Sequence, residues 1–442
     1  MLEEAKASKE LILIIPASSH PLFRLALSIF LNTPTTFSLL ILSALTPAEY
    51  RIKVISQKLI WLKKDFIPGA LVGISCATSN AYEAYKIADR FRQAGSTVVL
   101  GGPHVSCFPN EALAHCDSLV IGEGESAWPQ VIKDFENHAL QRIYRGEPLK
   151  DFFSPVYDYF LKVDPIILYR SGIMVSRGCK YHCEFCSQPL GGLRFIELEQ
   201  AISLIKRVKE AARGPFGYKP PIIFRDDNIF SSPGYAKRLF HRMIPLGLKW
   251  VGNSSLDIAF DAEALSLAKK SGCQGLFIGF ETIYPQKLAK TSVKGISSTD
   301  DYLKAIKNIK ACGIKVTGAF ILGFDYYTHK DYLRLIAFLF RARLHLISIT
   351  ILTPFPGSAL YEQLNKEGRI INFDWRKYDS LQHVVFKPKN MSALSLAAWF
   401  LVVRAVTMIL MPRYFFMVLG LVLLYHLSYF LSFELVSFLR GY

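Results

Sequence analysis

The sequence predicts an α/β protein with a doubly wound N-terminal domain, a partial (β/α)6 barrel and an apolar, helical C-terminal extension. Two series of short apolar runs, separated by helix-length segments, cover residues 11–121 and 173–351. A stretch rich in proline and aromatic residues lies between them, at 146–170. Because alternating strands and helices form parallel sheets covered by helices, we expect one such sheet from each series.

The first domain is expected at 1–145. Its opening run, Leu-Ile-Leu-Ile-Ile at 11–15, ends at Pro16 and fits a buried parallel strand. A helix is predicted at 81–93, and further strands are predicted at 52–55, 71–75, 97–100 and 118–121. This alternation indicates a Rossmann-like sheet, whose ligands bind at the carboxyl ends of the strands.

The prolines of 146–170 mark a linker to a second domain, expected at 171–360. Six strands are predicted there, at 173–176, 221–224, 250–254, 275–279, 315–322 and 346–351. Helix-length segments between them include 198–212, 261–271 and 299–311. Six βα units suggest a partial or complete barrel with its site at the C-terminal mouth.

The C-terminal extension, 361–442, becomes strongly apolar. Between 396 and 440 the only charged residues are Arg404, Arg413, Glu434 and Arg440, and the stretch 414–433 has none. Twenty uncharged residues can span a bilayer, lie in its interface, or pack against the protein, and all three readings stay open.

Composition excludes disorder and low complexity, since 51% of the 442 residues are apolar and only 20% are charged. The net charge of +16 resides mainly after residue 150, where 37 Lys and Arg face 22 Asp and Glu. Such a balance suits anionic lipid, nucleic acid or an acidic substrate. The acidic start, Met1-Leu-Glu-Glu, is unlike a secretory signal, so we expect a cytoplasmic protein.

Three of the eight cysteines are grouped as Cys179, Cys183 and Cys186, a CxxxCxxC pattern after the first predicted barrel strand. Thiolates at this spacing can each ligate a different iron of a [4Fe–4S] cluster and leave one iron open to a substrate. Zinc is the alternative, but it would need a fourth ligand, and His182 is poorly placed to supply it. The scattered cysteines Cys76, Cys273 and Cys312 fit small core residues.

The chain resembles the cobalamin-binding radical S-adenosylmethionine (SAM) enzymes over roughly residues 10–390. The resemblance rests on the cysteine pattern, with Phe185 before its third cysteine, and on the order of the motifs around it. These motifs are Gly101-Gly-Pro-His, Gly122-Glu-Gly-Glu, Phe224-Arg-Asp-Asp-Asn, Gly275-Leu-Phe-Ile-Gly-Phe-Glu, Gly318-Ala-Phe-Ile-Leu-Gly-Phe-Asp, Thr353-Pro-Phe-Pro-Gly-Ser and Tyr378-Asp-Ser with His383-Val-Val-Phe.

The resemblance implies that the open iron binds SAM, whose reductive cleavage gives a 5′-deoxyadenosyl radical that takes hydrogen from an unactivated carbon. Strand-end residues would hold the SAM ammonium and ribose; these candidates are Asp226, Asp227, Asn253, Ser254 and Glu281. Each could instead cap a helix or pair with a surface base.

Cobalamin would bind over the barrel mouth, at the strand ends of the first domain. The candidates are Ser75, Thr78, Gly101, Gly102, His104, Glu123, Gly124 and Glu125. Ordinary βα turn chemistry is the alternative for these residues. The chain lacks the Asp-x-His-x-x-Gly signature and with it the usual lower cobalt ligand, and 56–58 lacks the acidic residues often seen after the second strand. His104 is the one strand-end histidine that could ligate cobalt. The alternative for His104 is a structural role, as a hydrogen-bonding or loop residue.

The resemblance therefore implies a cobalamin-dependent methyltransferase acting on a hydrophobic, lipid- or isoprenoid-type substrate, similar to hopanoid methylases. An electron donor such as flavodoxin or ferredoxin and the inner face of the cell membrane are the expected partners. The alternatives are a non-methylating reaction such as ring closure or oxidation, a cobalamin or redox sensor, and RNA modification. No nucleic-acid partner is expected, because the sequence contains no recognisable RNA-binding module.

Overall fold

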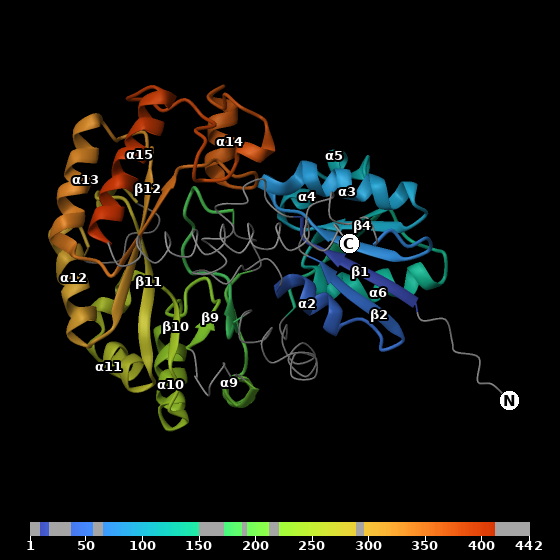
Figure 1. The fold of residues 1–442 in the computed structure, drawn as a ribbon. Helices are drawn as coiled ribbons and strands as arrows, with labels where there is room; N and C mark the ends of the chain where they lie inside the picture. The colour runs from blue at the N-terminus through green and yellow to red at the C-terminus, as the bar shows by residue number, and fades with distance from the viewer. Residues whose placement is uncertain are drawn as a thin grey trace, which may run out of the picture.

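The computed structural model describes residues 9–16, 37–55, 65–149, 172–187, 192–211, 221–288 and 296–411. Most of the predicted linker, residues 56–58 and the uncharged stretch 414–433 lie outside these ranges. Figure 1 shows two α/β units side by side, the N-terminal unit in blue and the barrel unit in green to orange. The predicted α/β fold class is confirmed.

The first unit is a parallel six-stranded sheet in the order β2-β1-β3-β4-β5-β6. Its strands are β1 (Lys9–Ile14), β2 (Tyr50–Ile55), β3 (Leu71–Ser75), β4 (Thr97–Gly101), β5 (Ser118–Gly122) and β6 (Ile143–Gly146). Its helices are α2 (Phe37–Ala44), η3 (Thr78–Asn80), α3 (Ala81–Gln93), α4 (Pro103–Cys107), α5 (Pro109–Leu113) and α6 (Gly124–Glu136).

Both faces of this sheet are buried, as a doubly wound fold requires. Ile12 and Ile14 of β1 belong to the core with α3 and α5, whereas Leu11 and Leu13 pack with α2 and α6. The strand order reverses between β1 and β3, and ligands of such sheets bind at the carboxyl edge near this reversal.

The second unit contains a parallel five-stranded sheet in the order β13-β12-β11-β10-β9, with its helices on the outer face (Figure 1). The strands are β9 (Ile222–Phe224), β10 (Trp250–Ser254), β11 (Cys273–Glu281), β12 (Lys315–Leu322) and β13 (Leu346–Ile351). The helices are α9 (Leu198–Ala211), α10 (Pro233–Met243), η5 (Ile244–Leu246), η6 (Leu256–Phe260), α11 (Ala262–Lys270), η7 (Pro285–Lys287), α12 (Thr299–Ala311) and α13 (His329–Ala342).

The strand predicted at 173–176 is reduced to one parallel bridge between Ile173 and Phe224. The next backbone amides, those of Val175 and Ser176, donate to the carboxylate of Asp226 and not to a strand. The chain then enters β7 (Ser176–Arg177), which pairs antiparallel with β8 (Arg194–Phe195). The Asp226 carboxylate therefore accepts backbone hydrogen bonds that a neighbouring strand would otherwise accept, just before the three cysteines.

The described part of the C-terminal extension contains α14 (Ala359–Lys366), η8 (Trp375–Lys377) and α15 (Ala393–Leu410). Helix α15 packs against α13 and β13, and its residues Leu396, Phe400 and Val403 are buried. In the described chain, α15 is the one helix whose length and hydropathy would permit a membrane span, a test that core helices of soluble proteins also pass.

Candidate active site

The three cysteines follow β7 in a short segment, residues 178–187, which we call the cysteine loop. Its start is held by Asp226, which accepts hydrogen bonds from Val175 and Ser176, and by Asp227, which accepts one from Gly178 N at 2.9 Å. Its far side is held where Leu360 N donates to Glu184 O at 2.8 Å. The backbone of the loop is thus fixed from both ends.

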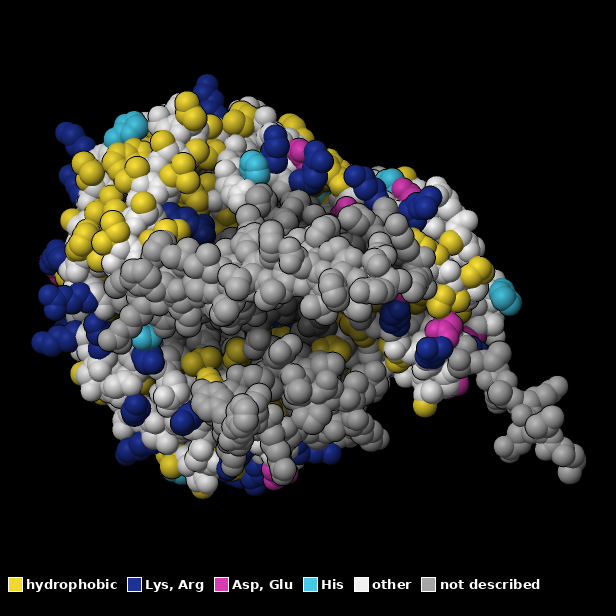
Figure 2. All heavy atoms as spheres, viewed as in Figure 1, with side chains coloured by type: hydrophobic (Ala, Val, Ile, Leu, Met, Phe, Trp, Pro, Cys, Tyr) yellow, Lys and Arg dark blue, Asp and Glu magenta, His cyan; other side chains and the backbone are white. Residues whose placement is uncertain are grey.

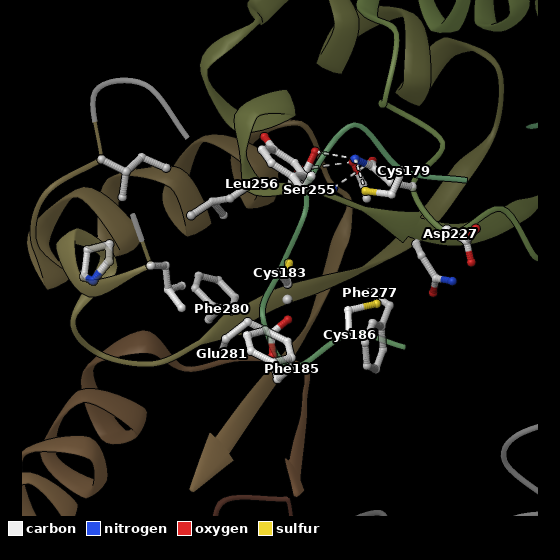
Figure 3. Close-up of a pocket in the computed structure, with 18 of the residues that line it drawn as sticks. Cys179, Cys183, Phe185, Cys186, Asp227, Ser255, Leu256, Phe277, Phe280 and Glu281 are labelled. Carbon is white, nitrogen blue, oxygen red and sulfur yellow. Dashed lines mark hydrogen bonds between the residues drawn. The ribbon is translucent and has the colours of Figure 1, made fainter. Parts of the chain in front are cut away.

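Cys179, Cys183 and Cys186 all line one pocket at the carboxyl ends of the barrel strands (Figure 3). Among the described residues, no three His, Cys, Asp or Glu side chains converge as ligands of a single ion would. The three cysteines share one pocket, which is what a cluster needs, since each of its thiolates ligates a different iron. Burial, together with the neighbouring Cys186 and Glu281, raises the pKa of Cys183 to about 12, so the thiol needs a metal's charge to ionise.

Asn228 connects the first cysteine to β10. Its amide nitrogen donates to Ser255 Oγ at 2.9 Å and lies 3.9 Å from Cys179 Sγ, while its oxygen accepts from Ser255 N at 3.0 Å. The sequence contained Asn228 within its Arg-Asp-Asp-Asn motif, but its role was not predicted. Its position directly after the two strand-end aspartates was the available signal.

Glu281 enters the pocket from a distorted strand end. The register between β11 and β12 shifts at 279–281, and Glu281 has a φ of 61°, which costs about 1–3 kcal/mol for a non-glycine residue. Gly279 makes room for it, since a Cβ there would lie 2.2 Å from the carboxylate. Burial raises the pKa of Glu281 to about 7, and no described residue pairs with it. An unpaired, nearly enclosed carboxylate suits a cationic ligand group such as the SAM ammonium.

Four of the five predicted SAM residues line this pocket: Asp227, Asn253, Ser254 and Glu281. Asp226 lies outside the lining, because its fully buried carboxylate holds the base of the cysteine loop. The pocket lining also includes residues that were not predicted as ligands, namely Tyr181, Phe185, Asn228, Ser255, Leu256, Phe277, Gly279, Phe280, Pro285, Leu288, Ile296 and Tyr302. Most are apolar, and apolar strand-end residues carry no distinctive sequence signal.

The predicted cobalamin residues gather along the carboxyl edge of the first sheet. Ser75 ends β3, Thr78 begins η3, and Gly101 ends β4. Gly102 has a φ of 105°, and a Cβ there would lie 2.7 Å from Cys76 O, so only glycine fits this turn. The glycine at 102 is therefore required by the packing of this turn on Cys76, and cobalamin contact by these residues stays a prediction.

His104 is completely buried among the rings of Phe108 and Trp375, and its Nε2 lies 3.4 Å from Glu111 Oε1. Its surroundings give it a packing role between the sheet edge and η8. Glu123 and Glu125 point toward the barrel unit, where they pair with Arg177 and Arg194. For these three residues the side chains contact protein, and cobalamin contact stays a prediction.

Comparison with known proteins agrees with this geometry. Residues 173–339 match the radical SAM superfamily model and residues 56–132 match the B12 binding domain model. The bacteriochlorophyllide d C-12(1)-methyltransferase of Chlorobaculum tepidum is 31% identical over 338 residues, which cover 75% of this chain and 73% of that enzyme. This chain belongs to the cobalamin-dependent radical SAM methyltransferases.

Membership in this methyltransferase family confirms the predicted enzyme class and its cofactors, a [4Fe–4S] cluster, SAM and cobalamin. The hopanoid C-2 methylase of Rhodopseudomonas palustris is 28% identical, covering 77% of this chain and 66% of that enzyme. The fold is similar to that of TsrM from Kitasatospora setae, with a TM-score of 0.62 and 17% identity over 81% of this chain and 78% of TsrM. That structure contains cobalamin and a [4Fe–4S] cluster.

Proposed function

We propose that this methyltransferase transfers a methyl group to carbon in a large, uncharged and hydrophobic substrate. The supporting observation is the inner face of the barrel sheet. In β10–β13, partly exposed residues alternate with buried ones, and the exposed set is in register across the strands. Lys315, at the amino-terminal end of β12, is the one charged member of this set before Glu281. From there to the carboxyl ends, where the pocket lies, the set is uncharged: Val251, Asn253, Phe277, Gly279, Thr317, Ala319, Ile321, Leu346, Ser348 and Thr350.

An uncharged wall favours an uncharged substrate, because a charged group placed against it would lose hydration without gaining a partner. Phe277 lies beside Cys186 in Figure 3 and can cover the substrate's apolar surface next to the cysteine loop. The small residue Ala319, next to Gly279 in the sheet, leaves room for a bulky skeleton. The wall thus selects for shape and hydrophobicity.

The protein residues bind and orient the reactants. Cys179, Cys183 and Cys186 would hold the cluster, and Glu281, Asp227, Asn253 and Ser254 surround the position of SAM. When bound, the cluster with SAM supplies a radical that abstracts hydrogen, and methylcobalamin supplies the methyl group. Exclusion of water by the apolar lining protects such reactive species from side reactions.

The names of two relatives support a hydrophobic substrate. One relative methylates a bacteriochlorophyllide and another is a hopanoid methylase. A second candidate reaction has a specific observation in its favour, because an anaerobic magnesium-protoporphyrin IX monomethyl ester cyclase is also similar, at 24% identity over 76% of this chain. Ring closure without methyl transfer is therefore the alternative outcome that an experiment must separate.

We also propose that the enzyme docks on anionic lipid through α13 and α15, whose outer surfaces form one apolar face. Its exposed residues are Leu333, Phe340, Leu394, Leu401, Val402, Met408 and Ile409. Figure 2 shows hydrophobic side chains gathered over this part of the barrel unit, with Lys and Arg at its margin. The exposed charges of α13 are Lys330, Arg334 and Arg341, while its single acid, Asp331, is buried.

The rim is mainly basic, although Arg341 pairs with the exposed Asp300 at 3.0 Å and Arg334 pairs with Asp331 at 2.8 Å. An apolar face with a mainly basic rim is the complement of an anionic bilayer surface. A membrane-docked enzyme would meet a lipid-soluble substrate at high local concentration. The basic balance of the chain also suits a small acidic electron carrier, such as flavodoxin or ferredoxin, as the source of the cluster's electron. Docking at the cytoplasmic face of the membrane is the localisation that we propose.

The deciding experiment is an anaerobic assay of the reconstituted enzyme with cobalamin, SAM, a strong reductant and a lipid extract. We expect 5′-deoxyadenosine and S-adenosylhomocysteine in comparable amounts, with label from methyl-labelled SAM in an apolar product. Deoxyadenosine without S-adenosylhomocysteine would support ring closure or oxidation. Label confined to a water-soluble product would contradict the hydrophobic substrate.

A further inference from the structure

The entrance to the cysteine loop contains an unfavourable arrangement of charge. In the two-stranded sheet of β7 and β8, Arg177 and Arg194 are directly opposite each other. Like charges at opposed positions destabilise a sheet, and a ribbon of two residues per strand is too short to be stable alone. Nevertheless β7 leads within two residues to Cys179, which must be held in place to ligate iron. Other groups must therefore stabilise this hairpin.

Two carboxylates of the first unit provide that stabilisation. Glu125 Oε1 accepts from Arg177 Nη2 at 2.7 Å, and Glu123 Oε2 lies 3.4 Å from Arg177 Nη1. Glu123 also accepts two hydrogen bonds from Arg194, one of them at 3.1 Å. Glu123 thus bridges the two arginines, and two negative charges balance two positive ones. We call these four residues the interdomain clamp.

The clamp is buried, unlike most ion pairs among the described residues. Side-chain exposure is 10% for Glu123 and 16% for Arg177. Although burial alone would raise the pKa of Glu123, the hydrogen bond from Arg194 and the charge of Arg177 lower it. In such surroundings, removing one partner leaves an uncompensated buried charge. The clamp is therefore sensitive to single substitutions.

The clamp also links the two cofactor regions, because its residues lie within a few positions of both in the chain. Glu123 and Glu125 follow β5 at the carboxyl edge of the first sheet, beside the expected cobalamin position. Arg177 precedes Gly178, whose amide donates to Asp227 in the SAM pocket. Arg194 and Glu123 additionally bond the backbone of Leu149, so the chain leaving the first unit is tied to the same point.

We propose that Glu123, Glu125, Arg177 and Arg194 are positioning residues that fix the cysteine loop against the cobalamin edge, and so set the distance between the cluster and cobalamin. Methyl transfer requires the hydrogen-abstracting group and the methyl donor to address the same substrate carbon. Since a flexible connection could not hold that geometry, a buried ion-pair network is suited to the task. The clamp rests on the established cofactors and does not depend on the identity of the substrate.

The test uses the full chain with reconstituted cluster and bound cobalamin, comparing Glu123→Gln and Glu125→Gln with wild type. Both variants keep the side-chain shape and remove one negative charge. We expect unchanged iron and cobalamin contents, about fivefold or greater acceleration of amide exchange in peptides from 176–187, and a weaker or broadened magnetic coupling between the reduced cluster and cob(II)alamin in EPR spectra. Glu125→Gln should have the smaller effect, because the pair between Glu123 and Arg194 remains.

Glu199→Gln is the matched control, because Glu199 pairs with Arg242 on the outer surface of the barrel and is 59% exposed. It should change neither readout. Exchange and EPR coupling unchanged from wild type in both clamp variants would overturn the proposal. So would loss of cobalamin with normal exchange in 176–187, which would make the glutamates cobalamin contacts. If Glu123→Gln does not fold, amide exchange and EPR coupling are measured on the milder Glu125→Gln alone, and they decide the proposal in the same way.

Discussion

The cysteines of this chain differ in whether they lie in the pocket and can ligate a cluster. Cys179, Cys183 and Cys186 line the pocket, whereas Cys273 is buried in the core and Cys312 caps the end of α12. Only the first group can deliver thiolates to a cluster. The three grouped cysteines and Cys312 therefore form a natural set for comparison.

Replacing any one of the three pocket cysteines with alanine should abolish SAM cleavage and lower bound iron to near zero, because a cluster with two thiolate ligands is not retained. Iron quantification and 5′-deoxyadenosine release are the measurements. Cys312→Ala should retain both within about twofold, since a partly exposed position outside a network changes stability little. A triple variant of the pocket cysteines that still cleaves SAM would disprove the cluster assignment.

Asp226 should make the stability of the protein depend on pH in an unusual direction. Burial raises its pKa to about 7 despite the hydrogen bonds from Ser176 and Val175, so between about pH 4 and 7 the folded state holds a proton that the unfolded chain has lost. Stability therefore falls as pH rises through this window. An asparagine side chain does not titrate, so the Asp226→Asn variant should not lose this stability. The Tm of the variant minus the Tm of wild type should therefore rise by up to about 5 °C from pH 5 to pH 8.

The measurement is thermal unfolding of both proteins across this range, with Asp226→Ala as a variant that loses the acceptor and is destabilised at every pH. Parallel Tm curves for wild type and Asp226→Asn would show that Asp226 ionises normally in the folded protein.

At the scale of elements, α15 has two different faces. One face packs on α13 and β13, and the other presents Leu401 and Ile409, which are 67% and 72% exposed. Burying a leucine or isoleucine side chain in lipid contributes about 1.5–3 kcal/mol. The double substitution Leu401→Glu and Ile409→Glu removes this gain and adds charge repelled by anionic lipid. We expect at least about tenfold weaker binding to phosphatidylglycerol vesicles.

Vesicle sedimentation measures this effect, and SAM cleavage without vesicles should be unchanged. Ile371→Glu is the control, because Ile371 is an exposed apolar residue outside the face, at 53% exposure. Equal sedimentation of the double variant and wild type would rule out this face as the docking surface.

The elements also show where sequence patterns are informative. Continuous apolar runs predicted β1, β3, β4 and β5, because strands covered on both faces need apolar side chains throughout. The short β6 was missed, since Ile-Tyr-Arg-Gly at an edge has no apolar run. The strand predicted at 173–176 failed for another reason: a distant side chain, Asp226, takes the amide donors of Val175 and Ser176.

At the scale of the whole molecule, the sequence predicted those parts of the site that lie in local motifs. The cysteine pattern and Glu281 lie in one pocket as expected. The partners of Glu123 and Glu125 could not be predicted, because Arg177 and Arg194 are about 50–70 residues away and a strand-end Gly-Glu-Gly-Glu equally fits a ligand-binding turn. Contacts between units depend on how two sheets meet, and no local periodicity encodes that geometry.

The position of α15 changes how the C-terminal extension should be tested. Removing 392–442 would take away Leu396, Phe400 and Val403 from the core, together with Met411, whose sulfur accepts from Ile347 N at 3.1 Å. Each lost core side chain costs about 2–4 kcal/mol, so we expect a chain ending at 391 to lose more than about 10 °C in Tm or to become insoluble. Loss of membrane binding in that chain would reflect damage to the fold.

A chain ending at Met411 keeps every described contact of α15 and separates the two membrane hypotheses. We expect it to match the full-length enzyme in Tm and SAM cleavage, and to retain salt-sensitive binding to anionic vesicles through α13 and α15, though more weakly because the uncharged stretch 414–433 is gone. Circular dichroism, deoxyadenosine release and vesicle sedimentation at two salt concentrations test this. Complete loss of vesicle binding with an intact fold would assign membrane attachment to 412–442 and remove the docking role from the α13–α15 face.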